Sequence, residues 1–235
     1  MSKGEGMIGI IGAENEEIKA IQSYMMIEEE IKKGTYTFFK GTIENKDVIL
    51  MHGGIGKVNA AVATTLLLTL FPIDYVLNIG SAGGLNPKQN VGDIVVSTNV
   101  VHYDVDVTAF GKELGQVPGM PTSFQADEHL LAIVQKALKN ENRVSHIGLI
   151  TSGDQFVARE DQVNFIHKNF HEAICVEMEA ASIAQVCYAF NIKFIIIRSL
   201  SDVYGHEESA IQFDIYLKNS SQVSAKLCHD VIELL

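Results

Sequence analysis

The stretch that decides the fold is MIGIIGAENEEI, residues 7–18. A short run of apolar residues and glycine is followed at once by a segment rich in glutamate, a pattern typical of a buried strand that leads into a helix. The run is continuously apolar rather than alternating, as expected for a strand that is covered on both faces of a sheet. This strand–helix unit predicts an α/β protein.

Outward from this unit, short β-rich runs alternate with helical patterns along the chain. The predicted strands cover residues 7–12, 46–54, 73–81, 92–101, 146–154, 173–179 and 192–202, and residues 35–43 form a hairpin arm that leads into 46–54. The predicted helices cover residues 15–26, 57–71, 127–139, 159–169, 180–190 and 213–234. We therefore expect one three-layer αβα domain over residues 7–235, with a mixed, mostly parallel, twisted central sheet. Residues 1–6 are either a short natural extension or a remnant of cloning.

Charge and composition exclude several classes of partner. The net charge of -11 disfavours nucleic acid and anionic membranes, which select basic surfaces. The longest apolar run, residues 60–71, is too short to span a bilayer, and the N-terminus lacks a signal peptide. Three scattered cysteines without CxxC spacing indicate a reducing cytoplasm and no zinc or disulfide framework. A soluble cytoplasmic protein with a small-molecule ligand is expected.

Polar residues gather where the predicted strands end. These ends read GAENEE, HGGIGK, GSAGG, TSGDQF, VEMEA and RSLSD. In open α/β sheets, ligands bind beyond the carboxyl ends of the strands. Glycines allow the backbone to come close to a ligand, and carboxylates provide polar contacts. The pattern predicts a polar small-molecule site at this edge of the sheet.

Three familiar motifs fail on inspection. HGGIGKV, residues 52–58, departs from the Walker pattern because Met51 and Val58 stand where a glycine and a Ser or Thr are required. No strand end carries GxGxxG with a downstream acidic residue, and no GxSxG is present. ATP, NAD and acyl-enzyme chemistry are therefore poorly supported.

The segment VHYDVDV, residues 101–107, places His102, Asp104 and Asp106 on one face of an extended chain. A metal site is conceivable there, but the sequence offers no second cluster of ligands. We prefer the interpretation of a loop or interface strand with hydrogen-bonded aspartates.

Asp202 and the pair Glu177 and Glu179 are the carboxylates of greatest chemical interest. Asp202 follows an apolar strand, where partial desolvation favours the protonated form of a potential acid, although a helix cap is an alternative role. Glu177 and Glu179 flank Met178 just before a predicted helix, whose dipole favours ionised carboxylates that accept hydrogen bonds from ribose hydroxyls. The two glutamates share one face unless the strand ends between them.

Helix geometry separates the glutamates of the opening stretch. If the helix starts near Asn15, Glu17 lies about 40° from the apolar Ile21 and faces the interior. Glu16 lies about 160° from Ile18 and is expected to face solvent. Glu14 also falls toward the interior, where it could add an anion beside Glu17 or turn away and cap the helix.

The segments IGAENEE, SGDQF, VEMEA and SLSD, together with NIGSAGGL and DVTAFG, resemble the 5'-methylthioadenosine/S-adenosylhomocysteine nucleosidases of the purine nucleoside phosphorylase superfamily. The resemblance runs in matching order from about Met7 to the C-terminus. It implies hydrolysis of the N-glycosidic bond of 5'-methylthioadenosine and S-adenosylhomocysteine in methionine salvage and the recycling of S-adenosylmethionine by-products, with 5'-deoxyadenosine as a further candidate. It also implies that no metal or organic cofactor is required.

The resemblance assigns roles to residues of both sides of the glycosidic bond. Asp202, held by Ser201, would protonate adenine N7, and Glu17 would direct the water. The other matched positions would contact base, ribose or alkylthio group: Ser81, Ile55, Phe156, Val157, Glu177, Met178, Glu179 and Phe213. Val107 and Phe110 match a pair that a partner subunit contributes to the neighbouring site, which implies a homodimer.

The residue types suit this chemistry, because cleavage of a C–N glycosidic bond needs an acid for the leaving base and a carboxylate that directs water. An anion at Glu17 would repel phosphate, and we interpret Arg198 as a structural partner of nearby carboxylates. The chain departs from the family pattern at Glu14, where methionine is usual, at Asn15, usually acidic, and in a loop after Asp202 that is one residue longer. A nucleoside phosphorylase, an aminofutalosine hydrolase and a non-catalytic adenosine-binding protein remain as alternatives.

Overall fold

The computed structural model describes residues 6–141, 143–205 and 209–235, and the side chains of 209–215 are not described. The opening stretch forms strand β1 (Met7–Gly12) and helix α1 (Asn15–Gln22), as predicted. β1 lies inside the sheet, paired in parallel with β4 (Lys46–His52) and β5 (Ile73–Gly84). Residues 8–12 are buried, which accounts for the continuous apolar run.

Most of the remaining elements follow the alternation that the sequence predicts, but the strands at residues 26–33 and 124–125 are not predicted. The other strands are β2 (Met26–Lys33), β3 (Tyr36–Ile43), β6 (Ile94–His102), β7 (Phe124–Gln125), β8 (Ser145–Ser152), β9 (Ala173–Glu177) and β10 (Lys193–Val203). The other helices are α2 (Lys57–Leu70), the short 3-10 turn η1 (Thr108–Phe110), α3 (Glu128–Leu138), α4 (Glu160–Asn169), α5 (Ala180–Phe190) and α6 (Ser209–Leu234).

The described strands form one mixed sheet in the order β10-β6-β8-β9-β5-β1-β4-β3-β2, with β7 beside β6. β5 pairs with β10 in parallel and also with β9 in antiparallel orientation, so five strands close into a ring. The β5–β9 pairing is confined to Gly83 and Gly84. A Cβ atom at Gly84 would lie 2.9 Å from Leu200 Cδ1, so glycine permits the close packing at this junction.

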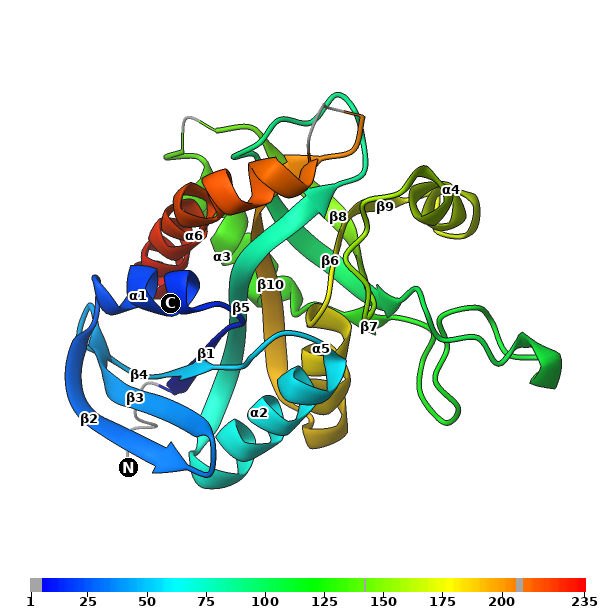
Figure 1. Cartoon of the computed structure of the whole chain (residues 1–235). Helices are drawn as coiled ribbons and strands as arrows, with labels where there is room; N and C mark the ends of the chain where they lie inside the picture. Colours follow the sequence, from blue (N-terminus) through cyan, green and yellow to red (C-terminus); the bar gives the residue numbers. More distant parts are fainter. Residues whose placement is uncertain (1–5, 142, 206–208) are drawn as a thin grey trace.

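Helices cover both faces of the sheet (Figure 1). Helices α1, α3 and α6 pack together on one face, and α2 packs against α5 on the other. The apolar core lies between these layers and includes Ile10, Leu50, Leu77 and Ile196, all fully buried. The predicted three-layer αβα arrangement with a mixed central sheet is confirmed.

Several predicted boundaries are wrong, and three of them matter for the site or the ends of the helices. The first helix ends at Gln22 rather than at residue 26, because the chain turns at Ser23, whose hydroxyl donates to the Ala20 carbonyl at 2.6 Å, and then enters β2. The last helix begins at Ser209 rather than at residue 213. The strand predicted over residues 173–179 ends at Glu177, so Glu177 and Glu179 do not belong to one strand face.

The segment of residues 103–123 projects from the body between β6 and β7 and carries η1 (Figure 1, green, right). Phe110, the last residue of η1, is 84% exposed. We call this part of the chain the projecting segment. In the described part of the chain, no helix combines the length and apolarity that crossing a bilayer would require.

Candidate active site

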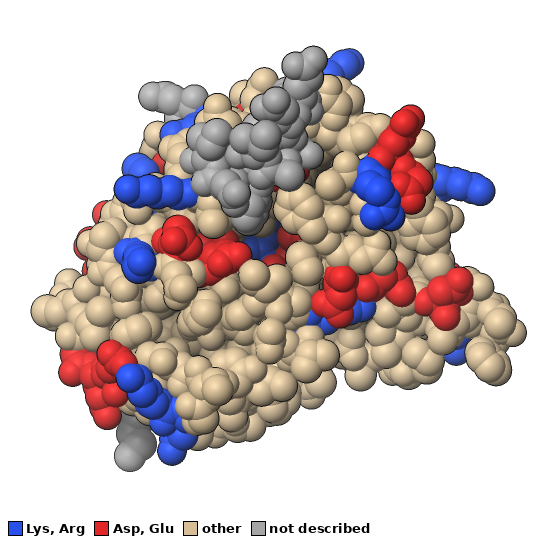
Figure 2. Space-filling view, in the orientation of Figure 1, with Lys and Arg blue, Asp and Glu red and all other residues tan. Residues whose placement is uncertain are grey.

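A cavity of about 300 Å³ opens at the carboxyl ends of the central strands. Acidic side chains gather around a hollow on this face of the molecule (Figure 2). Ten of the residues that the sequence nominates line the cavity: Glu17, Ile55, Ser81, Phe156, Val157, Glu177, Met178, Glu179, Ser201 and Asp202. The strand-end pattern therefore predicts the position of the cavity correctly.

Glu17 stands at the start of α1 with its side chain only 1% exposed. Its Oε2 atom accepts hydrogen bonds from the backbone N–H of Ala13 at 2.7 Å and of Glu14 at 3.1 Å. Its Oε1 atom accepts from the Ser81 N–H on β5 at 3.1 Å. Burial raises the pKa of Glu17, whereas the Arg198 charge and these N–H groups lower it. The predicted inward orientation is confirmed.

Asp202 lies near the end of β10, opposite Gly83 of β5, and is 5% exposed. The Ser201 hydroxyl donates to Asp202 Oδ1 at 3.0 Å. Burial raises the pKa of Asp202 to about 6, and the hydrogen bond from Ser201 acts in the opposite direction. A carboxyl group of this kind holds a proton at mildly acid pH and can donate it. The helix-cap alternative is not needed, because Asp202 lies within the strand and lines the cavity.

Glu177, at the end of β9, is hydrogen-bonded on every side. Its Oε2 atom accepts from the N–H groups of Glu179 at 3.0 Å and Ala180 at 2.8 Å, which caps α5. The Ser152 hydroxyl and the Arg198 guanidinium also bond to this carboxylate. Glu177 lines the cavity, but its carboxylate oxygens are already hydrogen-bonded within the protein, so its role is structural.

Arg198 is 1% exposed, does not line the cavity and contacts two of the glutamates that do. It donates to the Ile79 carbonyl at 2.9 Å and to Asn78 Oδ1 at 2.8 Å, in addition to its bond with Glu177. Its Nη2 atom lies 3.7 Å from Glu179 Oε2. The interpretation of Arg198 as a structural partner of nearby carboxylates is confirmed.

Glu179 is the first residue before α5, and its carboxylate lies at the cavity wall. Glu179 Oε1 accepts a hydrogen bond from the Gly56 N–H, at the start of α2, at 2.9 Å. Burial and the neighbouring Glu177 charge raise the pKa of Glu179 to about 8, whereas Arg198 and the Gly56 N–H lower it. Hydrogen bonds donated by a bound ligand would favour the charged form of this carboxylate and so oppose the raised pKa.

Glu14 also lines the cavity, half-buried beside Glu17. It occupies the N-cap position of α1 with Glu17 three residues on, so the two acidic residues share the start of one helix. Burial and the Glu16 charge raise the pKa of Glu14, and the nearby His52 lowers it. Glu16 is half-buried and is not among the residues that line the cavity.

Gly80 allows the cavity floor to pack closely. A Cβ atom at this position would lie 2.1 Å from Arg198 Nη1 and 2.8 Å from Glu17 Oε1. Only a residue without a side chain therefore lets β5 pass between these two groups. Gly80 belongs to the GSAGG strand end, and its role is the close backbone approach that this glycine-rich segment predicts.

Two nominated residues are not part of this cavity, and the position of a third is not described. Val107 and Phe110 lie in the projecting segment and do not line it. Phe213 falls in α6, and its side chain lies outside the described residues. The cavity also contains residues that were not nominated from the sequence: Ala13, Ala82, Gly83, Gln155 and Val176. Ala82 and Gly83 belong to GSAGG and Gln155 to TSGDQF, so the strand-end signal could have identified them.

The alternative metal site of residues 102–106 is not assembled. His102 Nε2 pairs with Gln185 Oε1 at 2.9 Å, Asp104 Oδ1 pairs with Lys57 Nζ at 2.6 Å, and Asp106 Oδ1 accepts from the Thr108 N–H at 3.0 Å. The three side chains therefore bind different partners. The preferred interpretation of hydrogen-bonded side chains is confirmed.

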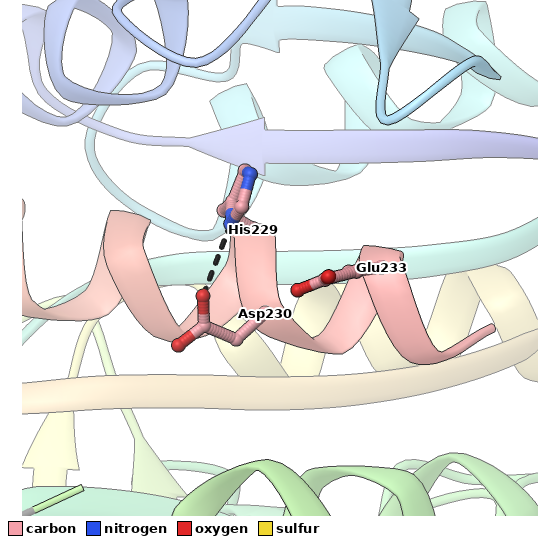
Figure 3. Close-up of side chains that lie close together, drawn as sticks. All are labelled: His229, Asp230 and Glu233. Carbon is pink, nitrogen blue, oxygen red and sulfur yellow. Dashed lines mark hydrogen bonds and ion pairs between the residues drawn. The ribbon is translucent and has the colours of Figure 1, made fainter. Parts of the chain in front are cut away.

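Figure 3 shows a second group of potential ligands, His229, Asp230 and Glu233, on α6 away from the cavity. His229 Nδ1 lies 3.0 Å from Asp230 Oδ1, and its Nε2 lies 3.1 Å from Glu44 Oε1. Lys226 Nζ lies 2.5 Å from Asp230 Oδ2. Because Lys226 and His229 already pair with Asp230, we interpret these three residues as a partly exposed ion-pair cluster on α6.

Comparison with known proteins identifies the family of this chain. The profile of the phosphorylase superfamily matches residues 7–233. A 5'-methylthioadenosine/S-adenosylhomocysteine nucleosidase from a Marinomonas species is 46% identical over 97% of this chain and 98% of its own.

Two solved structures carry the same name and have closely similar folds. The enzyme from Neisseria meningitidis, in complex with methylthio-immucillin-A, is 40% identical with a TM-score of 0.95 and covers 98% of this chain and 100% of its own. The enzyme from Colwellia psychrerythraea, in complex with adenine, is 40% identical with a TM-score of 0.94 and covers 98% and 96%. The chain belongs to the phosphorylase superfamily, and within it to the family of 5'-methylthioadenosine/S-adenosylhomocysteine nucleosidases.

Proposed function

We propose that this protein hydrolyses the N-glycosidic bond of 5'-methylthioadenosine and S-adenosylhomocysteine, with release of adenine and the corresponding thioribose. The observation that carries the proposal is the composition of the cavity wall. Among the described residues, the wall contains five carboxylates, Glu14, Glu17, Glu177, Glu179 and Asp202, and neither lysine nor arginine. Such a wall suits a sugar that develops positive charge as its bond to the base breaks.

Asp202 is the proposed acid for the leaving base. Its raised pKa of about 6 allows a buried carboxyl group to carry the proton that adenine N7 takes up as the C–N bond breaks. Ser201 orients the carboxylate through its hydroxyl group. Phe156 and Val157 line the same cavity and are the proposed contacts of the adenine ring.

Glu17 is the proposed group that directs the water. Its three backbone hydrogen bonds hold the carboxylate in one orientation. Glu17 contacts Ser81 of β5, and Asp202 pairs with Gly83 of the same strand. At about 3.3 Å per residue, the two attachment points are roughly 7 Å apart along β5. This separation leaves space for a sugar ring between the acid and the water, as in inverting glycoside hydrolysis.

Glu179 is the proposed acceptor for the ribose hydroxyl groups, with Met178 beside it and Ile55 on the alkylthio side. All three line the cavity. The proposed reaction balances. The oxygen of water bonds to C1' of the sugar while Glu17 takes a proton from that water, and the bond from C1' to adenine breaks while Asp202 gives its proton to adenine. No other co-reactant enters the balance.

Water is a better nucleophile than phosphate in this site. A phosphorylase needs cations or helix N-termini that converge on the phosphate oxygens. Arg198 is committed to Glu177, Asn78 and the Ile79 carbonyl, and Glu17 presents a carboxylate at the cavity wall. Phosphate at this position would meet like charge, which favours the hydrolase over the phosphorylase alternative.

A homodimer in the cytoplasm completes the proposal. Phe110, 84% exposed in the projecting segment, and Val107 are proposed to reach the site of the partner subunit. Further large apolar side chains are exposed on α2 and α5, among them Val58 at 73% and Tyr188 at 55%. Contact with a second subunit would remove this surface from water. The three free cysteines are all buried, which is consistent with a reducing compartment.

The decisive experiment is to measure adenine release from 5'-methylthioadenosine and from S-adenosylhomocysteine, with and without added phosphate. We expect release from both substrates at rates that do not depend on phosphate. Release that strictly required phosphate would favour the phosphorylase. The absence of release from either substrate would favour a related nucleoside or a binding function.

The Glu17→Gln variant is the matched control for that assay. The glutamine side chain has the same length and shape as glutamate but cannot accept the proton of the water. We expect binding of methylthio-immucillin-A to persist and turnover to fall by about 10²–10⁴-fold. Turnover close to that of the unmodified protein would reject the role of Glu17.

A further inference from the structure

Three polar contacts join two walls of the cavity to the base of the projecting segment. Lys57 Nζ, at the start of α2, lies 2.6 Å from Asp104 Oδ1. Asp104 Oδ2 accepts a hydrogen bond from the Asp154 N–H at 3.0 Å, and Asp154 Oδ1 accepts one from the Lys57 N–H at 2.7 Å. Each of the three residues thus contacts the other two, and we call this set the Asp104–Lys57–Asp154 triangle.

The triangle adjoins the cavity on two sides. Next to Lys57, Gly56 donates its N–H to Glu179, and Ile55 lines the cavity. Next to Asp154, residues 155–157 also line the cavity. A Cβ atom at Gly56 would lie 3.0 Å from Asp154 Oδ1, so the carboxylate packs directly over this glycine. The loop before α2 and the loop after β8 are thereby fastened to each other.

The ion pair at the centre of the triangle is shielded from water. The side chains of Lys57 and Asp104 are only 20% and 18% exposed. A pair of this kind is screened less than an exposed one, and removal of one partner leaves a poorly solvated charge. Both oxygens of Asp104 are occupied, so loss of the Lys57 ammonium group would disturb the contact with Asp154 as well.

We propose that Asp104, Lys57 and Asp154 are positioning residues that hold the ribose side and the base side of the cavity at the separation that the substrate requires. This inference rests on the proposed nucleosidase function. The triangle does not hold the two groups to which we assign the chemistry: Glu17 is bonded to Ala13, Glu14 and Ser81, and Asp202 to Ser201. Its contribution is therefore to substrate binding rather than to proton transfer.

The Lys57→Met variant tests this assignment through the separation of KM from kcat. We expect KM for 5'-methylthioadenosine to rise roughly 5- to 30-fold, whereas kcat stays within about threefold. A substitution that merely unfolds part of the protein gives the opposite result, because fewer active molecules lower the apparent kcat and leave KM unchanged. Lys57→Arg retains the ion pair and should restore KM to near its original value.

Two further variants complete the test. Lys226→Met removes a different ion pair, with Asp230 on α6, and should leave KM unchanged. The double variant combines Lys57→Met with Asp104→Asn. Because the two partners act together, the factor by which its KM rises should be at least threefold smaller than the product of the factors in the two single variants. An unchanged KM in Lys57→Met, or strictly multiplicative effects in the double variant, would overturn the proposal.

Calorimetric binding of methylthio-immucillin-A gives a readout that does not depend on turnover. The dissociation constant should rise in Lys57→Met by about the same factor as KM and stay constant in Lys226→Met. If the unmodified protein released no adenine, the nucleosidase function would fail while this measurement still tested the triangle. Equal affinity of Lys57→Met and the unmodified protein would refute the positioning role alone.

Discussion

Asp202 and Glu17 are carboxylates buried beside the same cavity, but their surroundings differ. Burial raises the pKa of Glu17, but three backbone N–H groups and the charge of Arg198 oppose this shift and favour the charged form. Asp202 receives a single hydroxyl group, and burial raises its pKa to about 6. Two similar side chains are thus prepared for opposite tasks, one as an anion that directs water and one as a proton donor.

The raised pKa of Asp202 predicts an effect on stability that depends on pH. The folded protein holds this proton more tightly than the unfolded chain, whose carboxyl has the usual pKa of 3.8. The stabilisation is therefore present at low pH and is lost as pH rises from about 4 through about 6. We expect Asp202→Asn to raise the free energy of unfolding by roughly 1–3 kcal/mol at pH 8, with a much smaller change at pH 4.

Denaturant unfolding of both proteins at the two pH values measures this difference, and adenine release should fall by about 10²-fold or more in the variant. An equal change in stability at pH 4 and pH 8 would contradict the raised pKa. Loss of stability at pH 8 would contradict it as well.

At the scale of elements, strand ends and helix starts meet to build the site. β9 ends at Glu177 and α5 begins at Ala180, so Glu177 caps the helix while Glu179 turns to the cavity. Alternation along a strand could not separate these two glutamates, because the strand ends between them. Likewise, the sequence pattern does not predict β2, because it is an exposed, glutamate-rich strand at the edge of the sheet without an apolar pattern.

Gly80 of β5 gives a prediction at this scale. Gly80→Ala places a methyl group against Arg198, which three bonds hold in place, and against Glu17. We expect the free energy of unfolding to fall by about 1–3 kcal/mol or more, because this buried packing cannot relax. Thermal unfolding measures the loss. In Gly34→Ala the methyl group meets nothing within 4 Å, although φ is also positive, so the control isolates the backbone cost. Equal losses in both variants would reject the packing argument.

At the scale of the whole molecule, the projecting segment bears directly on the proposed homodimer. Val107 and Phe110 belong to this segment and do not line the cavity of their own chain. A segment of this kind completes a site only if a second subunit receives it. The proposed dimer therefore contains two sites, each built from both chains.

Mixing of two impaired variants tests this arrangement. Glu17→Gln lacks the proposed base, and Phe110→Ser lacks the exposed apolar ring of the projecting segment. A mixed dimer has one site with an intact Glu17 and an intact Phe110 from its partner. After unfolding and refolding together in equal amounts, about a quarter of the original activity should return, since half the dimers are mixed and each has one intact site. Activity no greater than the mean of the separate variants would show that Phe110 serves its own chain.

The local pattern of the chain by itself determines the α/β class, the three layers and the edge of the sheet where the cavity opens. Apolar runs of strand length must be buried, and glycines and carboxylates at their ends then meet at one edge. The inward orientation of Glu17 also follows from helix periodicity alone. These features depend on spacing along one segment, which the sequence records directly.

Only the tertiary structure decides the burial, the hydrogen bonds and the neighbouring charges of each carboxylate. Glu177 accepts hydrogen bonds from Ser152 and Arg198, which lie on other strands, whereas Glu179 accepts one from the N–H of Gly56 in another loop. The closure of β5 onto β9 is likewise long-range, because it depends on two glycines whose neighbours lie on other strands. Burial and charge at a point in space sum over residues far apart in sequence, and for this reason the pKa values and the Asp104–Lys57–Asp154 triangle emerge only from the fold.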